Sequence, residues 1–219
     1  KTTRCISFLI NDTLAIDCGA ITSSLTLSEQ KNISSVLVTH SHFDHIKDIP
    51  LLALNFFRMK KSINIYALPD VNSAIVKYLL NGYVYPELYQ LPQDKPTVKF
   101  HRIIPLREYK IGKYSVNAVP VRHHGNTVGY QVRDFEGKTI FYTSDTGIGI
   151  SEALKQISCQ LLFIETTLPN ARGDYAQQTA HLTPKLLLNE LKLLRKSKGE
   201  LPRIVVVHID PFLKKQVEK

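Results

Sequence analysis

Short apolar runs enriched in β-branched residues recur along the whole chain. Each run is four to seven residues long, the usual length of a strand in a globular protein. The runs predict strands at Cys5–Ile10, Thr13–Ile16, Val36–Thr39, Ile63–Ala67, Ser115–Val121, Val128–Val132, Thr139–Thr143, Leu161–Ile164 and Ile204–Val207. The Asn11-Asp12 pair between the first two runs is typical of a tight hairpin turn.

Helical spacing of apolar residues interrupts these runs in three places. Pro50 occupies a first-turn position, and the apolar residues around it fall on one helical face: Ile49, Leu52, Ala53, Phe56 and Phe57. A second helix is predicted at Val71–Leu80, and a third after the N-cap Thr183. Strands mixed with helices, without a repeat or a linker, predict a single α/β domain spanning residues 1–219. The segment from Asn81 to Pro96 has no period and predicts a functional loop.

Composition and charge narrow the classes of protein to consider. The 219 residues are 43% hydrophobic, which suffices for one core, and no run is long enough to predict a membrane span. The first residues show no secretion signal, so we expect a cytoplasmic protein. Three scattered cysteines are too few for a disulfide framework or a thiolate metal site, and are expected to be small buried hydrophobes. The net charge of +9 favours phosphate-bearing partners, although the densest basic patch, Lys192–Lys198, lies at a predicted helix end.

The strongest chemical signal is a cluster of three histidines and one aspartate within six residues: His40, His42, Asp44 and His45. Packed together without a metal, these imidazoles would each need a partner and would repel one another on protonation. A metal cation removes both problems, because neutral imidazole and carboxylate are its ligands. The cluster begins at the carboxyl end of the predicted strand Val36–Thr39, where α/β sheets bind ligands. His40 and His42 project to the same side, whereas Asp44 and His45 diverge, which suits two metal ions.

Four further residues that bind metals or transfer protons each stand at the end of a predicted strand. They are His123, Asp145, Glu165 and His208. The chain has only 8 histidines, so such placement by chance is not expected. The pattern predicts one site at an edge of the sheet.

These motifs resemble the metallo-β-lactamase superfamily, whose signature is the H-x-H-x-D-H cluster. The resemblance spans nearly the whole chain and implies an αββα sandwich, with two mixed sheets packed face to face and helices outside. It implies one divalent ion on His40, His42 and His123, a second on Asp44, His45 and His208, and Asp145 as a bridge between them. Asp17 matches the family's early Asp-x-Gly, which supports ligands rather than binding metal. Zinc is the default ion for such ligands, with Mn and Fe as alternatives.

The adjacent histidines at 123 and 124 offer two choices for one ligand. The family's histidine stands six residues before a Gly-Tyr pair, here Gly129-Tyr130. This spacing selects His123 and leaves His124 as a pocket residue. His101 has no comparable setting and is expected to be a surface or strand residue.

Within the superfamily, four segments resemble the class II cyclic-nucleotide phosphodiesterases: Asn81–Leu88, Glu165–Asn170, Ala180–Pro184 and His208–Pro211. Phe43 and Tyr85 depart from that class, which usually has Leu and Trp there. The resemblance implies a phosphodiesterase that uses a metal-bridging hydroxide on a cyclic nucleotide or another small phosphodiester.

The same resemblance assigns roles to side chains beyond the ligands. Asp44 would also orient or deprotonate the nucleophile. His181, just before the helix cap Thr183, would contact phosphate or protonate the leaving oxygen, since helix N-termini favour anions. Three tyrosines are candidates for stacking on a base or lining the pocket, with packing over the core edge as the alternative: Tyr83, Tyr85 and Tyr89.

Three other functions fit parts of the pattern. An RNase Z-type tRNA 3′-processing endonuclease shares the ligands, but no insertion resembles its long tRNA-binding arm. The other two alternatives are a thioester hydrolase of the same superfamily and a binding module with a vestigial metal site. Nucleic acid is therefore a less favoured partner than a small phosphodiester, no membrane partner is expected, and a homodimer is possible.

Overall fold

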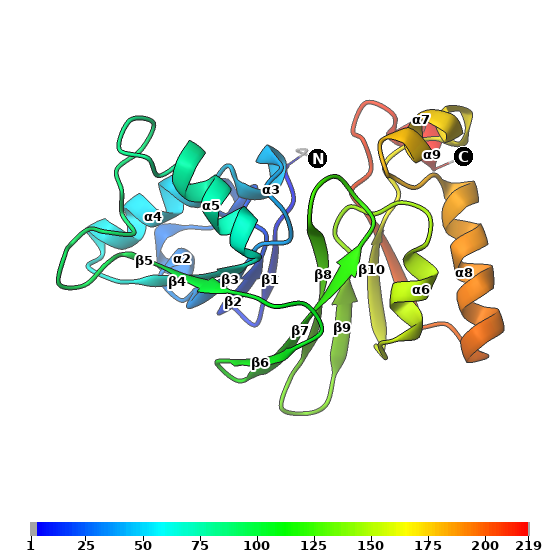
Figure 1. Cartoon of the computed structure of the whole chain (residues 1–219), viewed down its shortest axis with the longest axis horizontal. Coiled ribbons are helices and arrows are strands. Elements are labelled where there is room, and N and C mark those ends of the chain that lie inside the picture. The colour runs from blue at the N-terminus through cyan, green and yellow to red at the C-terminus, as the bar shows by residue number, and fades with distance from the viewer. Residues whose placement is uncertain (1–3, 219) are drawn as a thin grey trace. The chain divides into compact units, whose positions relative to one another are not determined.

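The computed structural model describes residues 4–218, and two compact units divide the chain (Figure 1): Lys1–Ile104 and Pro105–Lys219. Each unit contains its own β-sheet and is described on its own. A single domain spanning residues 1–219 stays a prediction.

The first unit is built on a five-stranded sheet in the order β1-β2-β3-β4-β5. Its strands are β1 (Phe8–Ile10), β2 (Leu14–Ile16), β3 (Ser35–Leu37), β4 (Ile63–Ala67) and β5 (Val98–Arg102). Its helices are α1 (Ile21–Ser24), α2 (Leu27–Gln30), α3 (Phe43–Ile46), α4 (Ile49–Arg58) and α5 (Pro69–Tyr78). β1 and β2 form the predicted antiparallel hairpin, with Asn11 and Asp12 both at positive φ in its turn.

Strands β2 to β5 are parallel, so their carboxyl ends lie at one edge of the sheet. In β4 the alternate residues Ile63, Ile65 and Ala67 are buried. Helix α4 has Pro50 in its first turn, as predicted, and buries an apolar face that includes Leu52. The pattern of each element therefore explains which of its faces meets the core.

The second unit contains a six-stranded sheet in the order β11-β10-β9-β8-β7-β6. Its strands are β6 (Glu108–Ile111), β7 (Tyr114–Val121), β8 (Thr127–Arg133), β9 (Thr139–Tyr142), β10 (Leu161–Glu165) and β11 (Arg203–Val207). Its helices are α6 (Ile150–Lys155), a short 3₁₀ turn at Asn170–Arg172, α7 (Gly173–Gln178), α8 (Pro184–Lys198) and α9 (Lys214–Val217). β9, β10 and β11 are parallel to one another. β7 runs in the same direction as β9, because β7 and β9 are each antiparallel to β8. The carboxyl ends of β7, β9, β10 and β11 therefore share one edge.

Helices α6 and α8 lie side by side along one face of this sheet (Figure 1). Their apolar residues, including Leu154 and Leu187, share a core with sheet residues such as Phe141. Helix α8 begins at the predicted cap, where the Thr183 hydroxyl accepts a hydrogen bond from a backbone N–H at 3.3 Å. The buried Glu190 of α8 accepts N–H groups at 3.0 and 2.9 Å from the start of α6, which ties the two helices together.

Several predicted boundaries are wrong. The first strand begins at Phe8 rather than Cys5, and β5 and β6 were not predicted. β5 combines apolar residues with Lys99, His101 and Arg102, so its composition alone does not predict a strand. The segment from residue 81 to 96 contains neither helix nor strand, as predicted. None of the helices in the described part of the chain has the length and hydrophobicity to cross a bilayer.

Candidate metal centre

In the first unit, the histidine cluster follows β3 and continues into the short helix α3. His42 is the residue before that helix, and Asp44 and His45 lie within it. The ring centroid of His40 lies 4.6 Å from that of His42 and 4.2 Å from that of His45. His40 and His45 are buried, as expected for ligands rather than for surface histidines. The predicted cluster is therefore a compact group of imidazoles.

Asp17 is a fully buried carboxylate that holds this cluster in place. It stands directly after β2 and accepts hydrogen bonds from the backbone N–H of Thr39 at 2.9 Å and from its hydroxyl at 3.0 Å. The Nδ1 atom of His45 lies 2.7 Å from the second carboxylate oxygen. This contact favours the His45 tautomer with its hydrogen on Nδ1, in which Nε2 carries the lone pair that could bind a metal. Nε2 lies 3.4 Å from the Asp44 carboxylate. These contacts are those of a supporting residue, as the family pattern implied for Asp17.

The glycine two residues after Asp17 permits a close backbone approach. A Cβ atom on Gly19 would lie 1.8 Å from the carbonyl oxygen of Asp44 and 2.7 Å from that of Ile6. The N–H of the intervening Cys18 donates to the His45 carbonyl at 2.7 Å. The Asp-x-Gly segment therefore supports the cluster through both its carboxylate and its backbone. Burial and the nearby carboxylates raise the pKa of Cys18 well above its usual value, so its thiol stays neutral.

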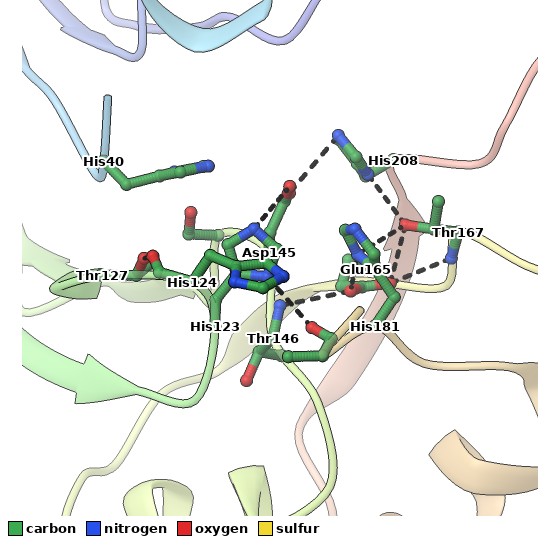
Figure 2. Close-up of polar contacts among 12 residues, drawn as sticks. His40, His123, His124, Thr127, Asp145, Thr146, Glu165, Thr167, His181 and His208 are labelled. Atoms are coloured by element: carbon green, nitrogen blue, oxygen red, sulfur yellow. Dashed lines mark hydrogen bonds and ion pairs between the residues drawn. The ribbon is translucent and has the colours of Figure 1, made fainter. Parts of the chain in front are cut away.

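In the second unit, the predicted residues meet at the edge where the strands end (Figure 2). The two oxygens of the buried Asp145 carboxylate face different histidines. One oxygen lies 3.7 Å from Nε2 of His123 and the other lies 3.3 Å from Nε2 of His208. His124 is exposed instead, with its ring centroid 5.6 Å from that of His123. The structure thus places His123 rather than His124 beside Asp145.

The second ring nitrogen of each histidine contacts a protein oxygen. Nδ1 of His123 lies 3.1 Å from the carbonyl oxygen of Ala180, and Nδ1 of His208 lies 2.8 Å from the Thr167 hydroxyl. In the first unit, Nδ1 of His40 lies 3.0 Å from the Thr39 hydroxyl. Histidines that bind metals through Nε2 typically donate their Nδ1 hydrogen to such an acceptor. The donor set therefore fits a metal ion in both its chemistry and its supporting contacts.

Left-handed backbone recurs at the turns that carry these side chains. Asp17, Ser144 and His208 have φ values of 58°, 61° and 54°, and each stands just after a strand. Ala180, the residue before His181, has φ of 52°. A side chain other than glycine is strained in this conformation, at a cost of about 1–3 kcal/mol, and such strain concentrates at functional sites. The left-handed residues at these strand ends therefore direct the side chains of the site and lower local stability.

The sequence predicts Glu165 at the end of a strand but does not indicate its role. Its carboxylate is fully buried and lies 2.8 Å from Nδ1 of His181 (Figure 2). It also accepts hydrogen bonds from the backbone N–H groups of Thr146, Thr167 and Leu182 at 3.2, 2.9 and 3.3 Å. The dense set of donors fixes the carboxylate, and the carboxylate fixes the imidazole. Ligand atoms of His181, Asp145 and His208 lie within 4.8 Å of one another.

The predicted substrate-binding tyrosines have three different settings. Tyr83 is 96% exposed, and Tyr85 is half-buried. The Tyr89 hydroxyl donates to Glu87 at 2.9 Å, which raises the pKa of Tyr89, and its ring centroid lies 6.2 Å from that of Phe100. Contact with substrate stays a prediction for all three and for His124. His101 is a strand residue as expected, and it stacks on Tyr66 at 4.4 Å.

Comparison with known proteins identifies the family. Residues 16–209 match the profile of the Beta-lactamase superfamily domain. The chain belongs to the beta-lactamase superfamily. This match includes every predicted ligand, from His40 to His208.

Relatives of this superfamily member include a curated protein and solved structures. A probable 3′,5′-cyclic-nucleotide phosphodiesterase of Yersinia pestis is 24% identical over 206 residues, covering 83% of this chain and 58% of the relative. Unliganded yeast PDE1 has a TM-score of 0.72 at 19% identity, over 86% of this chain and 61% of that one. The metallo-beta-lactamase fold protein YhfI from Bacillus subtilis has the same TM-score and identity, over 97% and 83%. The chain thus spans less than two thirds of the phosphodiesterase and of PDE1.

The structural similarity confirms the predicted fold class. This superfamily member has an α/β fold with two mixed β-sheets and helices, as in its metallo-beta-lactamase fold neighbours. At identities of 19% these structures show the fold alone. Function has to be argued from the site.

Proposed function

We propose that this chain is a metal-dependent hydrolase that holds two divalent ions and cleaves a phosphodiester. The observation that carries the proposal is the Asp145 carboxylate, which presents one oxygen to His123 and the other to His208. A carboxylate with two such neighbours suits a bridge between two ions. Paired ions suit phosphoryl chemistry because they can clamp both the attacking and the departing oxygen.

The proposed ligand set is the one that the family resemblance implies. His40, His42 and His123 would hold one ion, Asp44, His45 and His208 the other, and Asp145 both. Zinc is the ion that this donor set favours, with manganese and iron as alternatives. When bound, the ions supply Lewis acidity and an activated water nucleophile at neutral pH.

Two side chains have proposed catalytic roles beside the ligands. Asp44 orients the attacking water and accepts its proton. His181 donates a proton to the leaving oxygen through Nε2, because its Nδ1 lies 2.8 Å from Glu165. The Glu165 carboxylate accepts the hydrogen on Nδ1 and so holds the ring with Nε2 on its other side, which makes Glu165 a positioning residue.

We propose a cyclic nucleotide or another small phosphodiester as the substrate. The Yersinia pestis relative is named as a probable 3′,5′-cyclic-nucleotide phosphodiesterase, and the net charge of +9 favours an anionic substrate such as a nucleotide. Tyr83, Tyr85, Tyr89 and His124 are proposed substrate contacts. We further propose that the chain forms a single domain, acts in the cytoplasm and forms a homodimer.

Reconstitution of the metal-free protein with zinc or manganese tests the proposal. We expect turnover of bis(p-nitrophenyl) phosphate and of cyclic AMP to appear with about two equivalents of metal bound. Asp145→Ala should abolish turnover while leaving the circular dichroism spectrum unchanged. Asp134→Ala is the matched control, since that aspartate lies in the hairpin between β8 and β9.

Three outcomes would contradict the proposal. Full turnover in Asp145→Ala would remove the bridging carboxylate from the mechanism. A protein that binds no metal would refute the proposed metal-dependent hydrolysis. Activity on a precursor tRNA or a thioester, with none on small phosphodiesters, would show that the site catalyses a different reaction from the one proposed.

A further inference from the structure

Phe212 is an exposed aromatic side chain on the turn that follows the proposed ligand His208. Its exposed fraction is 96%, which leaves the whole ring in water. It stands four positions after His208 in the chain, a span of at most about 14 Å between Cα atoms. The chain therefore carries a large exposed ring close in sequence to a proposed metal ligand.

The backbone beneath this ring is held by hydrogen bonds. The N–H of Phe212 donates to the Asp210 carboxylate at 2.8 Å, and the N–H of Leu213 donates to the Asp210 carbonyl at 3.0 Å. Leu213 is buried against Leu168 and Ala176. The turn is therefore ordered on both sides of the ring, so presenting Phe212 to a ligand costs little conformational entropy.

One residue connects this turn to the site. The carbonyl oxygen of Thr167 accepts the N–H of Asp210 at 3.1 Å. The hydroxyl of the same threonine lies 2.8 Å from Nδ1 of His208 and 3.3 Å from Nδ1 of His181. Thr167 thus links the turn that carries Phe212 to His208 and His181.

We propose that Phe212 is a specificity-determining residue that stacks on the nucleobase of a nucleotide-type phosphodiester. This inference rests on the proposed function and names the substrate class of that site. An aromatic face binds a base of any identity, because every base has a π-face, and the interaction strengthens binding without entering the chemistry. The substrate is therefore recognised by its base as well as by its phosphate.

A pair of chromogenic substrates with the same leaving group tests this. Thymidine 5′-p-nitrophenyl phosphate carries a base, and methyl p-nitrophenyl phosphate does not. Phe212→Ala should raise KM for the thymidine compound about tenfold, or about 1.4 kcal/mol, with kcat unchanged, since stacking acts equally in the ground and transition states. The methyl compound should respond less than about twofold. Phe212→Trp should restore the low KM.

Phe135→Ala is the matched control. That phenylalanine is 73% exposed in the hairpin between β8 and β9, away from the strand ends that carry the ligands. It should change neither substrate. Equal effects of Phe212→Ala on both substrates, or no effect on either, would overturn the inference. A loss of self-association in Phe212→Ala, measured by sedimentation, with base selectivity intact would overturn it in favour of a contact between copies.

Binding measurements keep this test separate from the proposed activity. Calorimetric titrations of the metal-loaded protein with adenosine 5′-monophosphate and with ribose 5-phosphate need no turnover. The inference requires tighter binding of the nucleotide in the wild type and equal binding of the two in Phe212→Ala. A protein that hydrolyses no phosphodiester yet shows this pattern would refute the proposed function and retain the stacking role.

Discussion

Replacing Asp17 by Asn tests whether a buried carboxylate that touches no metal controls metal affinity. The substitution keeps the shape of the side chain and converts one oxygen acceptor into an NH₂ donor. One carboxylate oxygen accepts the backbone N–H of Thr39 at 2.9 Å, and the other lies 2.7 Å from Nδ1 of His45. An amide at this position therefore has two orientations, and each one disrupts a contact.

The first orientation places the NH₂ group against the Thr39 N–H, so two donors face each other. The second places it against Nδ1 of His45, which must then accept a hydrogen bond and carry its proton on Nε2 instead. A protonated Nε2 cannot bind a metal. Losing one hydrogen bond to a buried charge costs about 1.5–3 kcal/mol of the free energy of unfolding, or roughly 3–12 °C in Tm for a chain of this size. Metal affinity should fall about 10–100-fold.

Competition with a chromogenic zinc chelator measures the affinity, and calorimetry measures Tm with and without metal. Asp12→Asn is the matched control, because that aspartate is exposed in the β1–β2 turn. Its left-handed φ of 61° also suits asparagine. If Asp17→Asn bound zinc as tightly as the wild type, the tautomer argument for His45 would be refuted. A lower Tm with unchanged zinc affinity would leave Asp17 a purely structural residue.

Three further predictions concern the support of the site and the fold. Gly19→Ala, whose Cβ would lie 1.8 Å from the Asp44 carbonyl, should sharply lower Tm and metal affinity, whereas Gly173→Ala, with no atom within 4 Å, should change neither. Although burial raises the pKa of Asp48, hydrogen bonds from a lysine and a threonine outweigh it and hold that pKa below its usual value. The stabilisation of wild type over Asp48→Asn should therefore be complete above about pH 4 and disappear as the pH falls through the lowered pKa, in urea titrations at several pH values. Glu190→Gln should lose about 1–2 kcal/mol of unfolding free energy, because it weakens the two hydrogen bonds that N–H groups at the start of α6 donate to the buried Glu190 carboxylate. Urea unfolding that matches the wild type would contradict this.

The strand ends of the second unit show how far sequence reasoning reaches. Apolar runs located β7, β9, β10 and β11 to within a residue or two. A polar residue of suitable chemistry followed each run, and parallel direction brings such residues to one edge. Period and residue type are local properties of the chain, so they suffice to single out His123, Asp145 and His208.

Short elements were missed because their stability comes from distant contacts. Helix α3 has four residues and no side-chain cap, so nothing in its own sequence predicts a helix. It is held where the Cys18 N–H donates to the His45 carbonyl. The hydrogen-bonding partners of β5 come from β4, and β5 alternates too weakly to be recognised alone. Tertiary contacts decide such segments.

The choice of ligating nitrogen depends on contacts that sequence spacing cannot show. The Nδ1 partners of His45, His208 and His123 come from positions 28, 41 and 57 residues away. The residues around His45 predict a metal ligand by type, but only the fold shows that Asp17 fixes which nitrogen is available. Residues that hold the histidines from behind are therefore expected to influence metal affinity. Functional positions in this chain therefore include the residues whose oxygens contact the Nδ1 atoms as well as the histidines themselves.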